Sequence, residues 1–319
     1  MENMEVQEAK RNTSVEFMGN TDAHIHNIHI LMSFDFGFGI NVDTSLKLFI
    51  QDFSFIYLYM TPFFFFFPGY PMIFGTLVAL VAYQSFYPIC LMVPGILFFM
   101  QNDSHNLKAA LLKPLLSFLV SLGLLMVISA EIAGGWEFLE ATYGFILAAP
   151  DLTPNIGLFW YFFTEMFEHF RLFFLATFQI NAFVYVLPLA IRLRKDPVLL
   201  ATALLAFTAV FRSYPALGDV GIYLSLLPMW KHLYPFMRQT FIVGCMFVAT
   251  SVLGPIMYNL WIFSGSANAN FYFAVTLAFN TAQIFLVTDL LFAHVKREYH
   301  LIHGSKMEVD EVPARLILQ

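Results

Sequence analysis

The residues of this chain that could do chemistry gather in one aromatic-rich stretch, residues 143–174. Its apolar run is interrupted by polar and charged side chains, namely Asp151, Asn155, Glu165, Glu168, His169 and Arg171. Charged groups near hydrocarbon are costly and usually face a protein interior, a partner or lipid headgroups. The stretch therefore predicts a tertiary site at a membrane interface, either structural or in contact with a partner. The alternative is that Glu165, Glu168 and Arg171, at helical spacing, merely pair along one helix face.

A second candidate site is the small polar segment SGSANAN, residues 264–270, which lies between two apolar runs. Asn268 and Asn270 each carry one acceptor and two donors. Backbone amides at the start of a helix expected near Phe271 would add a positive dipole end. Such a segment suits a phosphate or the sugar hydroxyls of a lipid-linked glycan. Because Ser, Gly and Asn are also common in turns and N-caps, a simple turn is the alternative.

Two further charged residues have two interpretations each. Asp219 is expected within the helical bundle, where a carboxylate is a functional candidate, but it could also cap the N-terminus of a helix. Lys108 lies with Lys113 in the polar segment QNDSHNLKAALLK. These lysines could meet phosphate headgroups, or they could simply anchor the chain at the membrane surface.

The sequence predicts no catalytic residue. HExxH, CxxC, GxSxG and P-loop motifs are all missing from it. Glu168 and His169 are adjacent, so on a helix they would point about 100° apart and would not form an acid/base pair. The only cysteines, Cys90 and Cys245, lie within apolar runs and are expected to pack there.

Metal and nucleic-acid functions are also unsupported by the sequence. One histidine cluster, His24, His26 and His29, has alternating spacing and no cysteine nearby, so we predict neither a metal site nor a cofactor. The net charge of −6 comes largely from the two ends of the chain and leaves no basic stripe for nucleic acid.

Composition places the chain in the membrane. Hydrophobic residues make up 59% of its 319 residues and charged residues only 12%, and its mean hydropathy is +0.70. No charged residue occurs in 53–102 or in 239–288, and each gap is long enough for about two crossings. Helices satisfy their own backbone groups in lipid. We therefore expect an all-α polytopic integral membrane bundle of about eight transmembrane helices.

The chain divides into three regions by composition. Residues 1–47 are polar, lack the pattern of a signal peptide and are expected to be disordered. Residues 48–295 form the multi-span membrane domain, and 296–319 a cytosolic C-terminal tail. The acidic segment 131–151 carries no Lys or Arg and is expected in the lumen, whereas Arg192, Arg194 and Lys195 mark a cytosolic loop.

Two apolar runs do not fit single straight spans. Residues 72–100 contain Pro88 and Pro94, which predict a kinked span with a re-entrant or interfacial piece. Residues 156–191 exceed one span, so the part around Glu165 to Arg171 should lie obliquely or inside the bundle.

Five motifs in one order resemble the PIG-U (phosphatidylinositol glycan class U) family. They are YQSFYPICLMVPG (83–95), PDLTPNIGLFWYFFTEMFEHF (150–170), SYPALGDVGIY (213–223), WIFSGSANANF (261–271) and KREYHLIHG (296–304). The resemblance covers about residues 75–319, and residues 1–74 diverge from it.

This resemblance implies a non-catalytic, multi-pass subunit of the GPI transamidase in the endoplasmic reticulum membrane. Such a subunit would bind the GPI lipid and glycan, with Asn268 and Asn270 matching the two asparagines of the family's GSAN-x-N turn. It would also organise the other subunits, which the resemblance names as PIG-K, PIG-S, PIG-T and a GAA-type subunit. The nucleophile would belong to another, cysteine-protease-like subunit.

An enzyme is the alternative function. The family resembles the GPI mannosyltransferases in general architecture, so the chain could be a polytopic glycosyltransferase that uses a dolichol-phosphate sugar. Those enzymes carry a catalytic carboxylate in an early lumenal loop, and residues 1–74 offer no recognisable loop of that kind. A transporter is a third reading, supported only by polar residues within spans.

Overall fold

The structure is a computed structural model that describes residues 70–103, 106–304, 308–309 and 312–313. This part of the chain is helical apart from β1 (Glu308–Val309) and β2 (Val312–Pro313), which pair antiparallel near the C-terminus. The predicted all-α class is therefore confirmed. The expected disordered segment 1–47 and the histidines at 24, 26 and 29 lie outside the described residues.

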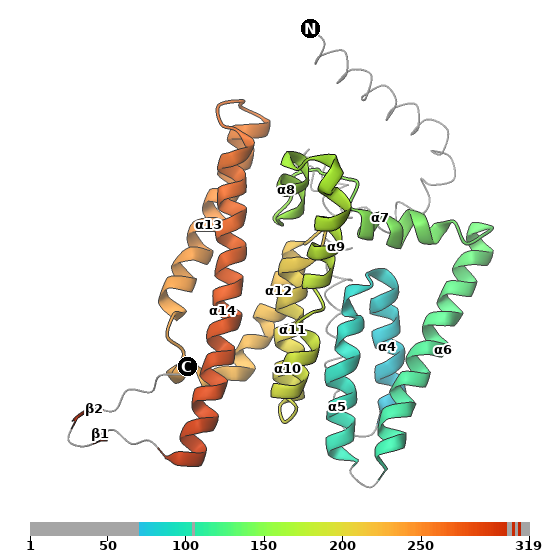
Figure 1. Cartoon of the computed structure of the whole chain (residues 1–319), viewed down its shortest axis with the longest axis vertical. Helices are drawn as coiled ribbons and strands as arrows, with labels where there is room; N and C mark the ends of the chain where they lie inside the picture. The colour runs from blue at the N-terminus through green and yellow to red at the C-terminus, as the bar shows by residue number, and fades with distance from the viewer. Residues whose placement is uncertain (1–69, 104–105, 305–307, 310–311, 314–319) are drawn as a thin grey trace. The chain divides into compact units, whose positions relative to one another are not determined.

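The first described helices form an up-and-down group. They are α4 (Pro71–Gln84), the short η1 (Tyr87–Leu91), α5 (Met92–Asn102) and α6 (Leu107–Ala133). Figure 1 shows α4, α5 and α6 side by side. Where the sequence predicted one kinked span, the chain breaks at Ser85 and Phe86 and begins a second helix. Pro88 lies in the first turn of η1, where its missing N–H costs nothing.

Small residues bring α4 and α6 together. A Cβ atom on Gly75 would overlap the carbonyl oxygen of Pro114, so the two backbones touch at this position. Thr76 Oγ1 and Ser117 Oγ are hydrogen-bonded across the same contact at 2.9 Å. Helix α6 then ends at Gly134, whose φ of 77° is the left-handed conformation that favours glycine.

The long run 156–191 is not one helix. It contains α8 (Phe159–Glu165), η3 (Glu168–Phe170), α9 (Arg171–Asn181) and α10 (Val186–Arg192). Met166 and Phe167, with ψ of 144° and 133°, are extended and separate α8 from η3. The chain therefore breaks where we expected an oblique or interior segment, and residues 165–171 are exposed or half-buried rather than inside the described bundle. Upstream, η2 (Glu140–Gly144) and α7 (Phe145–Ala148) lead into the loop before α8.

The simple pairing of charges along one helix face is wrong. Glu165 ends α8 and Arg171 begins α9, so the two residues do not share a helix. Arg171 Nη2 instead donates to the carbonyl oxygen of Ala149 at 2.9 Å. Ala149 adopts a left-handed conformation, with φ of 44°, at the end of α7.

Helix α11 (Pro197–Phe211) is central to the hydrophobic core. Every residue from Leu199 to Val210 is buried, and α11 contacts α5, η1, α12 and α14. The chain continues through α12 (Leu217–Leu226), η4 (Leu227–Phe236) and the hairpin of α13 (Thr240–Ile262) and α14 (Ala269–His303). Helix α14 thus runs past residue 296, where we placed the start of the tail.

Four helical segments of the described part are long and apolar enough to cross a membrane. They span residues 107–133, 168–192, 240–262 and 269–303. Three shorter apolar helices span residues 71–84, 87–102 and 197–211. Helices α6 and α13 leave large apolar side chains such as Val120 and Phe241 exposed, as expected of surfaces that face lipid. The number of about eight crossings stays a prediction.

The loops gather at two ends of the described bundle. Figure 1 shows the α13–α14 turn and the segment between α6 and α8 at one end, and the α5–α6 and α10–α11 loops at the other. The basic loop of Arg192 and Lys195 lies at this second end, where both residues pair with Glu298 of α14 at 2.8 Å and 3.9 Å. The acidic and basic loops are therefore segregated, as the charge pattern predicts.

Candidate functional site

The turn between α13 and α14 is fixed by its own polar atoms. Asn268 is the N-cap of α14, and its Oδ1 accepts from the backbone N–H groups of Asn270 at 3.1 Å and Phe271 at 3.4 Å. The N–H groups of Ser266 and Ala267 donate to the carbonyl oxygen of Leu260. The capping interpretation of Asn268 therefore holds, and its side-chain oxygen is engaged within the turn.

Asn270 joins this turn to the aromatic stretch. Its Oδ1 accepts from the hydroxyl group of Tyr161 at 2.6 Å, across 109 residues of sequence. The Tyr161 ring also stacks on Phe273, with the ring centroids 4.0 Å apart. The two regions that the sequence singled out separately thus meet in one place. Because both asparagine oxygens are engaged, the tip formed by Asn268, Asn270 and Tyr161 has two side-chain amide groups left as donors.

Aromatic side chains hold this tip against α8. The Trp160 ring stacks on Trp261 of α13, with centroids 5.7 Å apart, and lies 5.8 Å from the ring of Tyr272. Trp160 is buried, and its indole Nε1 has no acceptor among the described residues. Aromatic pairs of this kind add packing energy beyond their buried area, so the tip and α8 form one unit.

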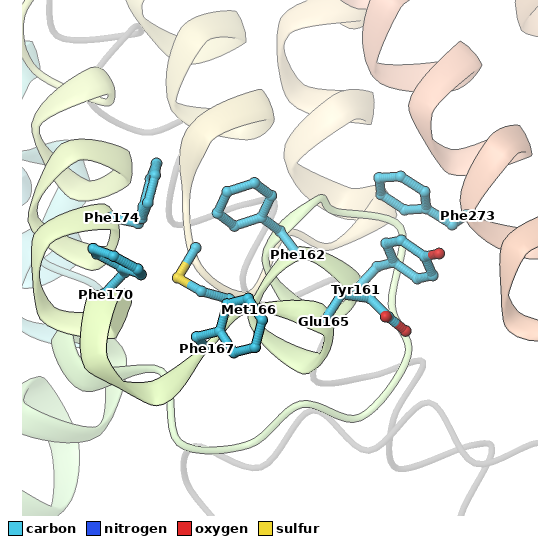
Figure 2. A pocket seen from close by; sticks show the side chains of 8 residues that line it. All are labelled: Tyr161, Phe162, Glu165, Met166, Phe167, Phe170, Phe174 and Phe273. Carbon is cyan, nitrogen blue, oxygen red and sulfur yellow. The ribbon is translucent and has the colours of Figure 1, made fainter.

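A cleft of about 310 Å³ lies beside this tip. Its walls, drawn in Figure 2, are Tyr161, Phe162, Glu165, Met166, Phe167, Phe170, Phe174 and Phe273. Seven of the eight lining side chains are aromatic or Met, and Glu165 is the only charged one. We call this feature the aromatic cleft. The break between α8 and η3 produces it, because the chain turns there and leaves Phe167 exposed.

Asp151 and Asn155 shape the loop that enters α8. Asp151 Oδ1 accepts from the backbone N–H of Thr153 at 2.9 Å, and Asn155 Oδ1 accepts from the N–H of Gly157 at 2.8 Å. Gly157 packs so closely on Pro215 that a Cβ atom would overlap the proline ring. Both polar side chains therefore stabilise a local loop conformation next to the α11–α12 turn.

Three other predicted residues are exposed. Glu168 and His169 lie in η3, where the His169 ring contacts Phe170 at a centroid distance of 5.1 Å. Lys108 is exposed in the first turn of α6. Helix α6 begins directly after the α5–α6 loop, which Figure 1 shows at the end of the bundle opposite the α13–α14 turn, so the structure does not bring Lys108 to the tip.

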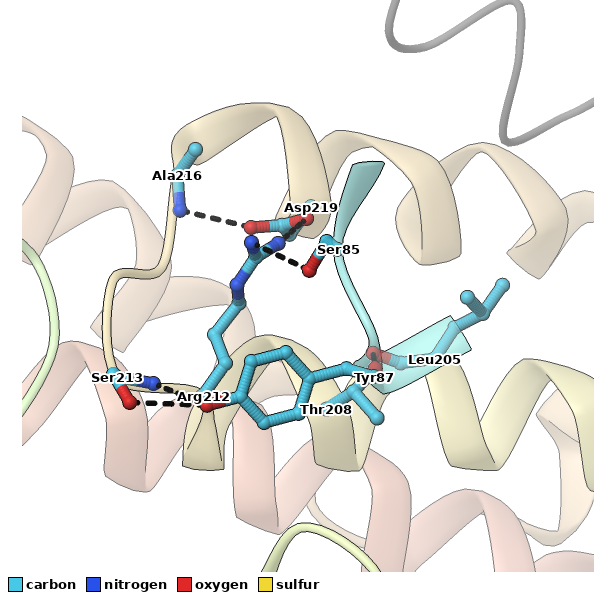
Figure 3. A network of polar contacts seen from close by, with 8 residues as sticks. All are labelled: Ser85, Tyr87, Leu205, Thr208, Arg212, Ser213, Ala216 and Asp219. Carbon is cyan, nitrogen blue, oxygen red and sulfur yellow. Dashed lines mark hydrogen bonds and ion pairs between the residues drawn. The ribbon is translucent and has the colours of Figure 1, made fainter. Parts of the chain in front are cut away.

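Asp219 belongs to a buried polar network, shown in Figure 3. Its Oδ1 pairs with Arg212 Nη1 at 2.6 Å, and its Oδ2 accepts from the N–H of Ala216 at 2.9 Å. This is one of the two hydrogen bonds of a capping box. The other is missing, because Ala216 has no side-chain acceptor for the backbone N–H of Asp219. Arg212 Nη2 donates to Ser85 Oγ at 3.2 Å, and its guanidinium lies 5.5 Å from the Tyr87 ring. The network therefore ties the α11–α12 turn to the break after α4.

Several polar residues were missed by the sequence reasoning. Gln179 bridges α9 to α7 and to the α11–α12 turn, because it donates to Ile146 O at 3.0 Å and to Ser213 Oγ at 2.8 Å. Asn280, buried in α14, donates to Ile156 O at 2.8 Å. Asp289 accepts from the backbone N–H groups at the start of α13. Each is a polar residue within an apolar run, which is the signal that could have identified them.

The fold and the tip define a helical membrane protein with a donor-rich turn and an aromatic cleft at one end. The family model described as "GPI transamidase subunit PIG-U" matches residues 38–279, and the chain belongs to this family. The match begins at residue 38, upstream of the motifs that carry the resemblance.

Individual relatives agree with the family match. The human "GPI-anchor transamidase component PIGU" is 44% identical over 250 residues, which cover 76% of this chain and 58% of the relative. The "GPI transamidase component GAB1" of Saccharomyces cerevisiae is 32% identical over 247 residues, covering 76% of this chain and 61% of the relative. The chain thus spans about three-fifths of the length of these relatives.

Proposed function

We propose that this chain is a non-catalytic, multi-pass subunit of the GPI transamidase in the endoplasmic reticulum membrane. In this proposal it binds the GPI glycolipid at its α13–α14 tip and helps to organise the PIG-K, PIG-S, PIG-T and GAA-type subunits. The bundle has about eight crossings in an arrangement similar to the GPI mannosyltransferases. The names of the relatives, which are transamidase components, support the assignment to this complex.

The binding proposal rests on the hydrogen bonds of the two asparagines, whose side-chain oxygens are both engaged. Asn268 Oδ1 accepts from the backbone, and Asn270 Oδ1 accepts from Tyr161. Their amide groups are therefore left as donors at the start of α14, where the helix dipole is positive. Such a tip favours ligands rich in acceptors, such as the phosphate and sugar oxygens of a lipid-linked glycan.

Charge segregation supports a lumenal tip. The tip lies at the same end of the bundle as the segment between α6 and α8, which contains most of the acidic, base-free segment 131–151, whereas the Arg192 to Lys195 loop lies at the other end. Under the positive-inside rule the basic end is cytosolic. An amide-lined tip in the lumen is accessible to a glycan that is attached there to proteins.

The glycosyltransferase alternative gains no support from Asp219 or Asp151. Asp219 is buried and committed to Arg212 and Ala216, and Asp151 caps a loop. A general acid or base would need to reach a bound substrate. We therefore keep the non-catalytic proposal.

Replacing each asparagine with aspartate tests the binding role. Asn268→Asp keeps an N-cap acceptor, and Asn270→Asp keeps an acceptor for Tyr161, so the turn should survive. Both changes remove the amide donors and add a negative charge that repels phosphate. We expect the double variant to lower surface GPI-anchored proteins at least about ten-fold, the loss of roughly 1.4 kcal/mol of binding, in cells that lack the native subunit.

The control is Asn259→Asp, the same chemical change at an exposed residue of α13. Co-purification with the other subunits should be unchanged in all variants. Normal surface display by the double variant would reject the tip as the binding site. Loss of co-purification would assign the asparagines to assembly instead.

A further inference from the structure

The aromatic cleft carries one carboxylate at its edge, that of Glu165. Tyr161 and Glu165 are four residues apart in α8, so they lie one above the other on the same face. Figure 2 shows the carboxylate beside the Tyr161 ring, with Phe170 and Phe174 at the opposite side of the cleft. Glu165 is exposed and has no ion-pair partner within the described part of the chain.

The aromatic rings and the carboxylate that line the cleft favour a positively charged ligand. The faces of aromatic rings are electronegative and attract an ammonium group within about 6 Å of the ring centre. The carboxylate adds a full negative charge. The only hydrogen-bond donor among the lining side chains is the Tyr161 hydroxyl, and it is already engaged with Asn270. The lining side chains therefore offer no free hydrogen-bond donor to an anion.

The neighbouring cation of the chain does not fill this role. Arg171 follows the cleft residues in sequence, but its Nη2 donates to Ala149 O at 2.9 Å. Its guanidinium lies 5.4 Å from the ring of Phe163, which is not a lining residue. No Lys or Arg of the described residues lines the cleft, and we therefore consider a cation that belongs to another molecule.

The surroundings indicate that this molecule is a lipid. Leu172 and Phe173 of α9 follow the lining residue Phe170 and are 77% and 67% exposed, which provides apolar surface for acyl chains. We propose that the aromatic cleft binds the primary ammonium group of a phosphatidylethanolamine headgroup. Glu165 accepts hydrogen bonds from the ammonium, and the rings surround it. A quaternary ammonium would lack those charge-assisted bonds, so choline headgroups bind less tightly.

This proposal is separate from the glycolipid proposal, because it depends on Glu165 and the lining rings rather than on the asparagine amides. The test uses the full chain in detergent, titrated with phosphatidylethanolamine or phosphatidylglycerol and followed by native mass spectrometry. We expect preferential binding of phosphatidylethanolamine. Glu165→Gln should weaken it about five-fold and leave phosphatidylglycerol unchanged. Glu131→Gln, at an exposed site in α6, is the matched control and should change neither.

A second variant distinguishes the attraction of the aromatic rings for the ammonium group from simple hydrophobic contact. Phe170→Leu keeps the wall hydrophobic but removes one ring, so it should weaken phosphatidylethanolamine selectively. The proposal is overturned if Glu165→Gln has no effect, or if both lipids weaken equally, which would indicate an acyl chain in the cleft. It is also overturned if Glu165→Gln only reduces co-purification with other transamidase subunits, because the occupant would then be a basic side chain of a partner.

Discussion

The buried ion pair of Arg212 and Asp219 permits a quantitative test of the fold. The two side chains are 13% and 7% exposed, and Nη1 and Oδ1 are 2.6 Å apart. We consider Asp219→Asn, which keeps the shape of the side chain and an oxygen for the N–H of Ala216. The change removes the negative charge and leaves the Arg212 guanidinium buried without its counter-ion.

The expected cost follows from this burial. Removing one member of a buried pair costs about 3–5 kcal/mol, because the remaining charge stays desolvated. Arg212 keeps its contacts with Ser85 and Tyr87, so we expect the lower end, about 3 kcal/mol. Adding Arg212→Met to Asp219→Asn removes the unpaired charge and should recover about 1–2 kcal/mol of that loss.

The measurement is the free energy of unfolding of the full chain in mixed micelles, followed by helical circular dichroism. Glu298→Gln is the control, since it breaks the Arg192–Glu298 pair, which is 2.8 Å long but much more exposed. That change should cost less than about 1 kcal/mol. If Asp219→Asn costs no more than the control, the pair is not shielded from water and our account of the network is refuted.

Two other substitutions test the contacts that hold the candidate site and the bundle. Tyr161→Phe removes the hydrogen bond to Asn270 but keeps the stacking on Phe273. It should lower the free energy of unfolding by about 1 kcal/mol and reduce the amount of GPI-anchored proteins at the cell surface. An unchanged amount at the surface would show that the orientation of Asn270 is unimportant. Gly75→Val places a branched side chain against the backbone of Pro114 and should destabilise the α4–α6 contact by more than about 2 kcal/mol. Normal stability of that variant in the same micelle assay would contradict the close approach of the two helices.

Hydrogen bonds between helices extend from the Arg212–Asp219 network toward the α13–α14 tip. Gln179 and Ser213 link α9 to the α11–α12 turn, and Asn280 links α14 to the loop before α8. The middle of α14 is therefore fixed to the loop before α8, and its N-terminal turn is fixed to α8 by the bond between Tyr161 and Asn270. Because apolar contacts between membrane helices are weakly directional, such hydrogen bonds help to specify one arrangement.

The sequence by itself determined the class, the family and the presence of one apolar run too long for a single span. Long uncharged gaps and the excess of apolar residues require membrane helices, because chain length and hydrophobicity are local properties. The 36-residue run from 156 to 191 is too long for one span, and the chain does break at Met166 and Phe167. The five ordered motifs gave the family that the comparison confirmed.

Only the tertiary structure decided which polar residues meet. Tyr161 and Asn270 are 109 residues apart, and no spacing rule connects them. The sequence left Asp219 as either a functional carboxylate or a cap, and the structure shows a cap that is also the partner of Arg212. Helices that are apolar on all sides carry little information about which face packs where. The partners of each polar residue were therefore fixed by packing, not by sequence pattern.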